Sequence, residues 1–161
     1  MLIPTRKVFA SLALCLLLPS WGLSAADGRH SDALTEMFVW WNSAYKHPDG
    51  FTAAAFGKYF TADAVLRVNG IDRCKGLAEW AAHFRDIQAH TEMVEIELPF
   101  IDEFESPGGD RIFTHHIVLA REHGKSGRAR VMGYAAIRDG KISLLNFVSL
   151  QDPDASGTGQ K

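Results

Sequence analysis

The sequence is poor in cysteine, in long apolar runs and in surplus charge. Its most apolar stretch, residues 8–18, is shorter than the roughly 20 residues that a helix needs to cross the hydrocarbon core of a membrane. The formal net charge at pH 7 is −2, from 17 basic and 19 acidic residues, so the excess of basic residues that binds nucleic acids and anionic membranes is missing. We therefore expect no nucleic-acid partner and no membrane association of the mature protein.

The first residues show the features of a cleavable secretion signal in the required order. Arg6 and Lys7 form a basic start, residues 8–18 form the apolar region, and residues 24–26 are small, as cleavage requires. We predict a signal peptide at residues 1–26 and an exported protein, periplasmic or extracellular. Its removal takes two basic residues and changes the formal net charge from −2 to −4.

The mature chain then keeps Cys74 alone, because Cys15 lies within the signal. One cysteine cannot form an internal disulfide, so stability must come from the core or from a partner chain. No His, Cys, Asp and Glu residues stand at metal-ligand spacing, and no nucleotide-binding loop or nucleophile elbow occurs. We expect neither a metal nor another cofactor.

Periodicity predicts three helices and then a sheet. The helices are expected at residues 32–46, 52–60 and 76–90. Asn69-Gly70 signals a hairpin of two short strands, because both residues tolerate a positive φ. From Met93 the apolar period becomes two, which is typical of strands. Turn sequences at 106–109, 124–127 and 139–140 divide this part into a four-stranded antiparallel meander.

The length after the signal suffices for one hydrophobic core and is too short for two ordinary domains. We predict one domain at residues 27–152 and a polar, disordered tail at 153–161.

Three segments carry a resemblance to a known superfamily. They are YFTADAVLRVNG (59–70), CKGLAEWAAHF (74–84) and YAAIRDGKISLLNF (134–147). Together with the order of elements, they resemble the nuclear transport factor 2-like superfamily and, within it, the SnoaL-like and ketosteroid isomerase-like proteins. The resemblance implies an α+β fold, a cone-shaped curved antiparallel sheet with about three helices packed on its concave face. Members include isomerases, cyclases, dehydratases, hydrolases and non-catalytic binding domains, so no single activity is implied.

Strand register predicts which side chains face the pocket. A two-residue turn at 139–140 pairs Arg138 with Lys141 and thereby fixes the pairing of all further residues in the two strands that it connects. One resulting face mixes large apolar groups with polar ones, as ligand cavities do, and we assign it to the concave side. Its candidate ligand-binding residues are Arg130, Met132, Leu145 and Phe147, together with Tyr134.

The next loop decides which histidine faces this pocket. If residues 124–127 form a four-residue loop, His115 lies opposite Ala136 and faces the cavity, while His116 faces outward; an odd loop length reverses the two. We predict His115 and Tyr134 as the candidate catalytic acid–base pair, because imidazole titrates near neutral pH and a buried phenol can donate to a developing oxyanion. A purely structural role for both remains the alternative. The helical side adds aromatic candidates for an apolar ligand: Trp41, Tyr45, Phe60, Trp80 and Phe84.

The activities known in the superfamily that the sequence resembles need carboxylates that this chain does not supply. At the positions of the isomerase base and acid stand Val68 and Met132. The polar residues of the first helix, Asn42 and Tyr45, include no acid, which puts scytalone dehydratase-like activity in doubt. An epoxide hydrolase-like Asp-Arg-Asp set is also missing.

Two functional hypotheses follow. One is an exported, cofactor-free isomerase, cyclase or dehydratase that acts on a small apolar substrate by acid–base catalysis; the other is a non-catalytic ligand-binding or dimerisation domain. We also predict a homodimer through the outer face of the sheet, because that face would otherwise expose an apolar patch. Its expected members are Val131, Ala135, Ile142, Leu144 and Val148.

Overall fold

The computed structural model describes residues 33–152. The predicted signal peptide and the predicted tail at 153–161 lie outside the described residues. None of the helices in the described part has the length and apolarity needed to span a bilayer.

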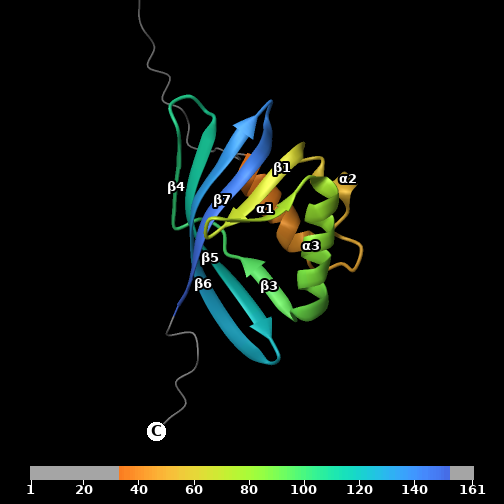
Figure 1. Cartoon of the computed structure of the whole chain (residues 1–161). Coiled ribbons are helices and arrows are strands. Elements are labelled where there is room, and N and C mark those ends of the chain that lie inside the picture. Colours follow the sequence, from red (N-terminus) through yellow and green to blue (C-terminus); the bar gives the residue numbers. More distant parts are fainter. Residues whose placement is uncertain (1–32, 153–161) are drawn as a thin grey trace, which may run out of the picture. The chain divides into compact units, whose positions relative to one another are not determined.

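Three helices and seven strands follow one another along the described chain (Figure 1). In order they are α1 (Ala33–Ala44), α2 (Ala53–Phe56), β1 (Phe60–Val68), β2 (Ile71–Lys75), α3 (Leu77–His90), β3 (Met93–Ile96), β4 (Asp102–Glu105), β5 (Arg111–Glu122), β6 (Lys125–Arg138) and β7 (Lys141–Gln151). The strands form one sheet in the order β2-β1-β7-β6-β5-β3, and β4 also pairs with β5. All pairs are antiparallel except β1 with β7.

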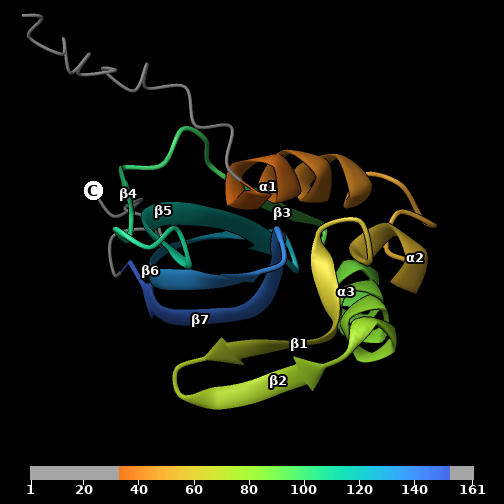
Figure 2. The same cartoon turned by 90° about the horizontal axis from the view of Figure 1, so that it is seen from above.

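The sheet is open and curved, and the helices lie on one side of its long strands β5, β6 and β7 (Figures 1 and 2). This confirms the α+β class. The second helix is shorter than expected: it ends at Phe56 with Gly57 as its C-cap, and Phe60 opens β1. The first predicted strand of the meander is divided in the structure into two strands, β3 and β4, which pair with different parts of β5. Pro99 lies between them, and a residue without an N–H cannot extend a ladder.

Three of the hairpin turns are two residues long, with positive φ at both positions. They are Asn69-Gly70, His123-Gly124 and Asp139-Gly140. Positive φ at both central residues is the signature of a type I′ turn, which matches the twist of the flanking strands. The first and third were predicted. The expected four-residue loop at 124–127 was wrong, because Glu122 already pairs with Lys125.

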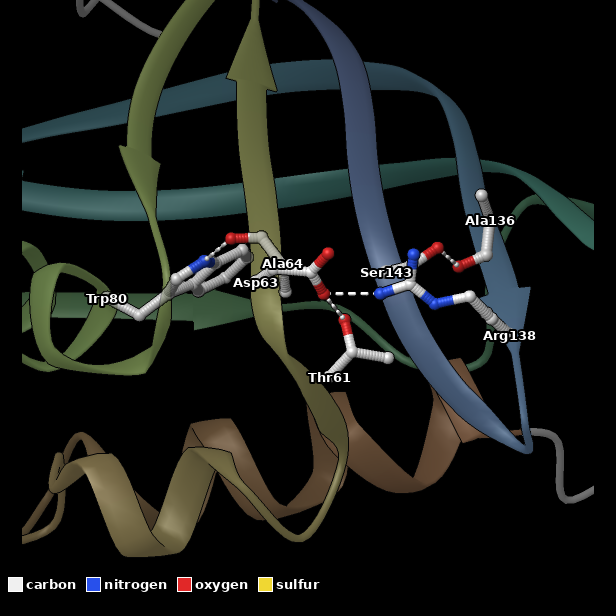
Figure 3. A network of polar contacts seen from close by, with 7 residues as sticks. All are labelled: Thr61, Asp63, Ala64, Trp80, Ala136, Arg138 and Ser143. Carbon is white, nitrogen blue, oxygen red and sulfur yellow. Dashed lines mark hydrogen bonds and ion pairs between the residues drawn. The ribbon is translucent and has the colours of Figure 1, made fainter.

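A bulge in β7 changes the predicted register of the sheet. Ile137 pairs with Ile142, as the turn requires, but Ala136 pairs with Leu144, so Ser143 is an extra residue. The Ser143 hydroxyl donates to the carbonyl oxygen of Ala136 at 3.1 Å (Figure 3). Beyond the bulge, every β7 residue lies opposite a β6 residue one position away from the expected partner, which exchanges the two faces.

Gly133 lies where β6 closely approaches the backbone of β7. Its φ is 156°, and a Cβ built there would stand 2.1 Å from the carbonyl oxygen of Asn146. Real side chains cannot approach a backbone oxygen so closely, so this position requires glycine. The close approach of β6 to β7 therefore depends on one residue.

The core between the helices and the concave face combines aliphatic residues with closely packed aromatic rings. The rings of Phe60 and Trp80 are 4.3 Å apart, and the Trp80 indole N–H donates to the carbonyl oxygen of Ala64 at 3.0 Å (Figure 3). The same view shows Asp63 bound by Thr61 and by the Arg138 guanidinium. That ion pair is exposed and joins the beginning of β1 to the end of β6, across β7.

Candidate functional site

A cavity of about 310 Å³ lies between the helices and the concave face of the sheet. Helices α1 and α3 supply Met37, Phe38, Trp41, Trp80, His83, Phe84 and Ile87. The strands supply Leu66, Val68, Val94, Ile96, His116, Val118, Val131, Leu145, Phe147 and Ser149. The volume falls in the range of small-molecule sites, about 300–1,000 Å³.

The walls follow from simple spacing rules. Phe38 and Trp41 stand three residues apart on α1, and Trp80 and Phe84 stand four apart on α3, so each pair shares a helix face. On the sheet, lining residues alternate with residues of the opposite face. Val131 lines the cavity from β6, and the next position on the same face of the strand is Gly133, which carries only a hydrogen.

Apart from the indole N–H groups of the two tryptophans, three polar side chains line the cavity: His83, His116 and Ser149. None of the described residues that line it is acidic or is a lysine or arginine. Within residues 33–152, no three His, Cys, Asp or Glu side chains gather as a metal site would need. The cavity is therefore suited to an uncharged, largely apolar molecule.

His116 is the most enclosed of these polar groups, with 2% of its surface exposed. Its Nδ1 lies 3.1 Å from the hydroxyl oxygen of Thr114, two residues earlier on the same face of β5. The rings of Phe38, Phe100 and Phe147 surround the imidazole at centroid distances of 5.2, 5.6 and 5.4 Å. Burial lowers the pKa of His116 to about 4, with a smaller contribution from the neighbouring His115, so the imidazole is neutral at physiological pH.

His83 approaches the cavity from α3. Partial burial lowers its pKa, and the nearby Arg73 acts in the same direction, whereas Asp86 opposes the change. Two neutral imidazoles on the cavity wall give it hydrogen-bonding capacity without fixed charge.

Five of the residues predicted as candidates for ligand binding line the cavity: Trp41, Trp80, Phe84, Leu145 and Phe147. Two others are buried but are not among the lining residues. The Tyr45 hydroxyl donates to the carbonyl oxygen of Thr91 at 2.8 Å, and Phe60 packs against Trp80.

Four predicted site residues lie on the outer face instead. They are His115, Arg130, Met132 and Tyr134, of which the register places His115 opposite Met132. The expectation that this set faces the cavity was wrong, because the bulge at Ser143 pairs Leu145 with Ala135 and not with Tyr134. Leu145 and Phe147 were thus assigned to the correct face, and the β5 and β6 residues to the wrong one.

On the outer face, His115 and Tyr134 contact different residues. His115 Nδ1 is 3.5 Å from a carboxylate oxygen of Asp102, while His115 Nε2 is the one fully buried side-chain nitrogen or oxygen without a partner in the described part of the chain. The Tyr134 ring packs against Phe113, with the Arg111 guanidinium 5.7 Å from its centroid. His115 and Tyr134 are not brought together at the cavity.

Asn42 and the lining His116 are the main residues whose roles sequence reasoning missed. The Asn42 side-chain amide donates to the carbonyl oxygen of Ile96 at 2.8 Å and accepts from its N–H at 2.9 Å, which joins α1 to β3. Assigning His116 to the cavity face would have required knowledge of the bulge in β7. The other lining residues carried a signal, because Phe38 and Ile96 belong to the helical and strand periodicities.

Comparison with known proteins supports this architecture. The SnoaL-like domain family matches residues 41–145, which is more than half of the chain. No protein with a curated description matches the sequence.

The solved structures that share the fold include the following three. An NTF2-like protein of unknown function from Exiguobacterium sp. 255-15 is 17% identical and has a TM-score of 0.60, covering 75% of this chain and 98% of its own. A protein with a ketosteroid isomerase-like fold from Catenulispora acidiphila, in complex with trimethylamine, is 14% identical, with a TM-score of 0.55 and coverages of 75% and 88%. IdmH, a putative polyketide cyclase from Streptomyces antibioticus, is 14% identical, with a TM-score of 0.55 and coverages of 77% and 92%.

Proposed function

Because the chain belongs to the SnoaL-like domain family, we propose that its cavity binds a small, largely apolar, uncharged molecule. The observation that carries the proposal is the cavity itself, about 310 Å³ in volume, with walls of aromatic and aliphatic side chains and no charged group among the described lining residues. Burial of apolar ligand surface contributes roughly 25 cal/mol per Å², so these walls can supply most of the affinity.

A cofactor-free enzyme that works on such a molecule by acid–base chemistry is the second candidate. It is favoured by His116, whose imidazole lines the cavity. His115 and Tyr134, on the outer face, take no part in it. The cavity wall supplies no carboxylate, so a mechanism that needs a carboxylate base does not fit the described residues.

Adjacent residues on β7 give a direct test of the cavity. Ser149 lines it, whereas Leu150 is exposed on the opposite face. Ser149→Trp should fill the cavity and abolish thermal stabilisation by indane, an apolar probe without hydrogen-bonding groups. Leu150→Trp should keep the stabilisation, about 2.7 kcal/mol at a concentration of 100 Kd. Equal responses of the two variants, or none in the unmodified protein, would count against ligand binding.

A homodimer through the outer face of the sheet is part of the proposal. The supporting feature is a set of exposed apolar side chains, here called the outer-face patch. It comprises Phe104 (62% exposed), Met132 (44%), Val148 (50%) and Leu150 (56%). Three of the expected members, Val131, Ala135 and Ile142, are instead buried in the core. Val148 is the predicted member that is strongly exposed, and covering such a patch with a second copy removes it from water.

Export completes the proposal. It is supported by the basic, apolar and small-residue segments of residues 1–26.

A further inference from the structure

We propose that His116 presents a fixed Nε2–H donor to the cavity and that the bound molecule carries an uncharged acceptor, such as a ketone carbonyl oxygen, at that end. This inference rests on the proposed ligand-binding function. It specifies the chemical class of the ligand and the polar group that recognises it.

The Thr114 hydroxyl fixes the position of the imidazole proton. Thr114 is buried, and among the described residues its side chain has one hydrogen-bond partner, Nδ1 of His116. If Nδ1 carried the proton, it would donate to the hydroxyl oxygen and leave the buried O–H without an acceptor, which costs about 1–3 kcal/mol. If the hydroxyl donates to Nδ1, one bond satisfies both groups. The proton then resides on Nε2.

The geometry places Nε2 on the cavity side. On the concave face of β5, His116 stands between Thr114, which does not line the cavity, and Val118, which does. Nδ1 faces Thr114, so the other ring nitrogen faces away from it. His116 Nε2 has no partner among the described residues, yet it is not one of the fully buried unpartnered atoms. The space left next to it belongs to the cavity that His116 lines.

The chemistry that follows is selective. A neutral imidazole whose Nδ1 lone pair is occupied can donate from Nε2 but cannot accept there. Burial keeps it neutral by lowering its pKa to about 4. An acceptor oxygen on the ligand satisfies this donor, whereas a group that can only donate, such as an indole N–H, leaves two donors facing each other. The absence of charged groups from the described wall makes a carboxylate or ammonium costly to bury.

The first experiment determines which ring nitrogen of His116 carries the proton. Long-range ¹H–¹⁵N correlation spectra of the full exported protein distinguish the two tautomers of His116 by the chemical shifts of its ring nitrogens. The expected result is protonated Nε2 in the unmodified protein and in Thr114→Ser, which keeps the hydroxyl, and a mixture of tautomers in Thr114→Val. A proton on Nδ1 in the unmodified protein would overturn the inference.

The second experiment uses three probes of similar shape: indane with no polar group, 1-indanone with an acceptor, and indole with an N–H donor. Calorimetry compares the unmodified protein with His116→Phe. Loss of one hydrogen bond should weaken 1-indanone by about 3- to 10-fold. Indane and indole should lose no affinity, because neither is bonded by Nε2–H.

The outcomes separate the two proposals. If indane and 1-indanone both bind and His116→Phe weakens them equally, or if indole is the probe most weakened, the acceptor preference is wrong while the cavity function stands. If none of the probes binds, the ligand-binding function fails, and the spectra still decide the tautomer.

Discussion

The imidazoles of His115 and His116 lie on opposite faces of β5, one beside the Asp102 carboxylate and the other inside the cavity. Successive side chains of a strand point to opposite faces, so two neighbours of the same type meet different environments. Each histidine is therefore a natural control for the other.

Replacing His115 by leucine should leave the cavity unchanged and cost little stability. Its Nε2 is buried without a hydrogen-bond partner. Replacing such a group by an apolar side chain of similar size is nearly neutral or stabilises the fold by up to about 1 kcal/mol. Its contact with Asp102, an exposed carboxylate, adds little. Urea denaturation measures the stability, and the thermal shift caused by 1-indanone measures the cavity. A large loss of that thermal shift in His115→Leu, but not in His116→Leu, would show that His115 belongs to the ligand-binding site.

Stability should fall on mild acidification because of His116. Its pKa is lowered from 6.5 to about 4 in the folded state, so the unfolded chain binds a proton first as the pH falls. The contribution is fully present above about pH 6.5 and is lost progressively toward pH 4. One pKa unit corresponds to about 1.4 kcal/mol, so the loss between pH 7 and pH 5 should be about 2 kcal/mol.

His116→Phe is the control for this pH dependence, since it removes the titrating group and keeps a ring. Denaturant titrations at pH 7 and pH 5 should show a smaller loss in His116→Phe by that amount. Equal losses in both proteins would show that His116 does not titrate in this window.

Gly133→Ala should destabilise the fold. The added methyl would stand 2.1 Å from the carbonyl oxygen of Asn146 at a φ of 156°, and strain with overpacking of this kind costs about 2–4 kcal/mol. Gly127→Ala is the matched control on the same strand, because its nearest neighbour is the end of the Gln151 side chain at 3.9 Å. Thermal denaturation of both variants tests this, and similar melting temperatures would contradict it.

Val148→Lys should convert the proposed dimer to a monomer, since it puts a charge in the outer-face patch. Val39→Lys should not, although Val39 is similarly exposed, at 57% against 50%. Light scattering at micromolar concentration measures the mass of each. A folded monomer of the unmodified protein would remove the dimer from the proposal.

The exported protein should begin at Asp27, after removal of residues 1–26. Mass spectrometry of the protein recovered outside the cytoplasm gives its N-terminus. A variant that starts at Asp27 behind an initiator methionine should stay inside the cell. Recovery of the full-length chain starting at Met1 would contradict cleavage.

The fold could be predicted from local signals, but the face of each strand could not. Asn69-Gly70 and Asp139-Gly140 are turns because both residues accept positive φ, and α3 follows from apolar spacing. The wrong position of the loop after β5 did not change which β5 and β6 residues share a face, because both the expected and the observed loops have an even number of residues. Ser143 alone caused the exchange, and a serine within a strand gives no sign that it is a bulge.

Core and cavity walls also look alike in a sequence. Trp41 lines the cavity and Phe60 does not, although both are large aromatic residues buried from solvent. Hydrophobicity predicts burial, and only the packing of neighbouring elements decides which buried rings border an empty space.

Asn42 has a consequence for the behaviour of the protein in concentrated solution. Strand β3 ends the sheet, and such an edge offers unpaired backbone groups to strands of other molecules. The Asn42 amide occupies both the N–H and the carbonyl oxygen of Ile96, as a neighbouring strand would. A single side chain thus protects this edge of the sheet at Ile96 against intermolecular strand addition and the aggregation that follows from it.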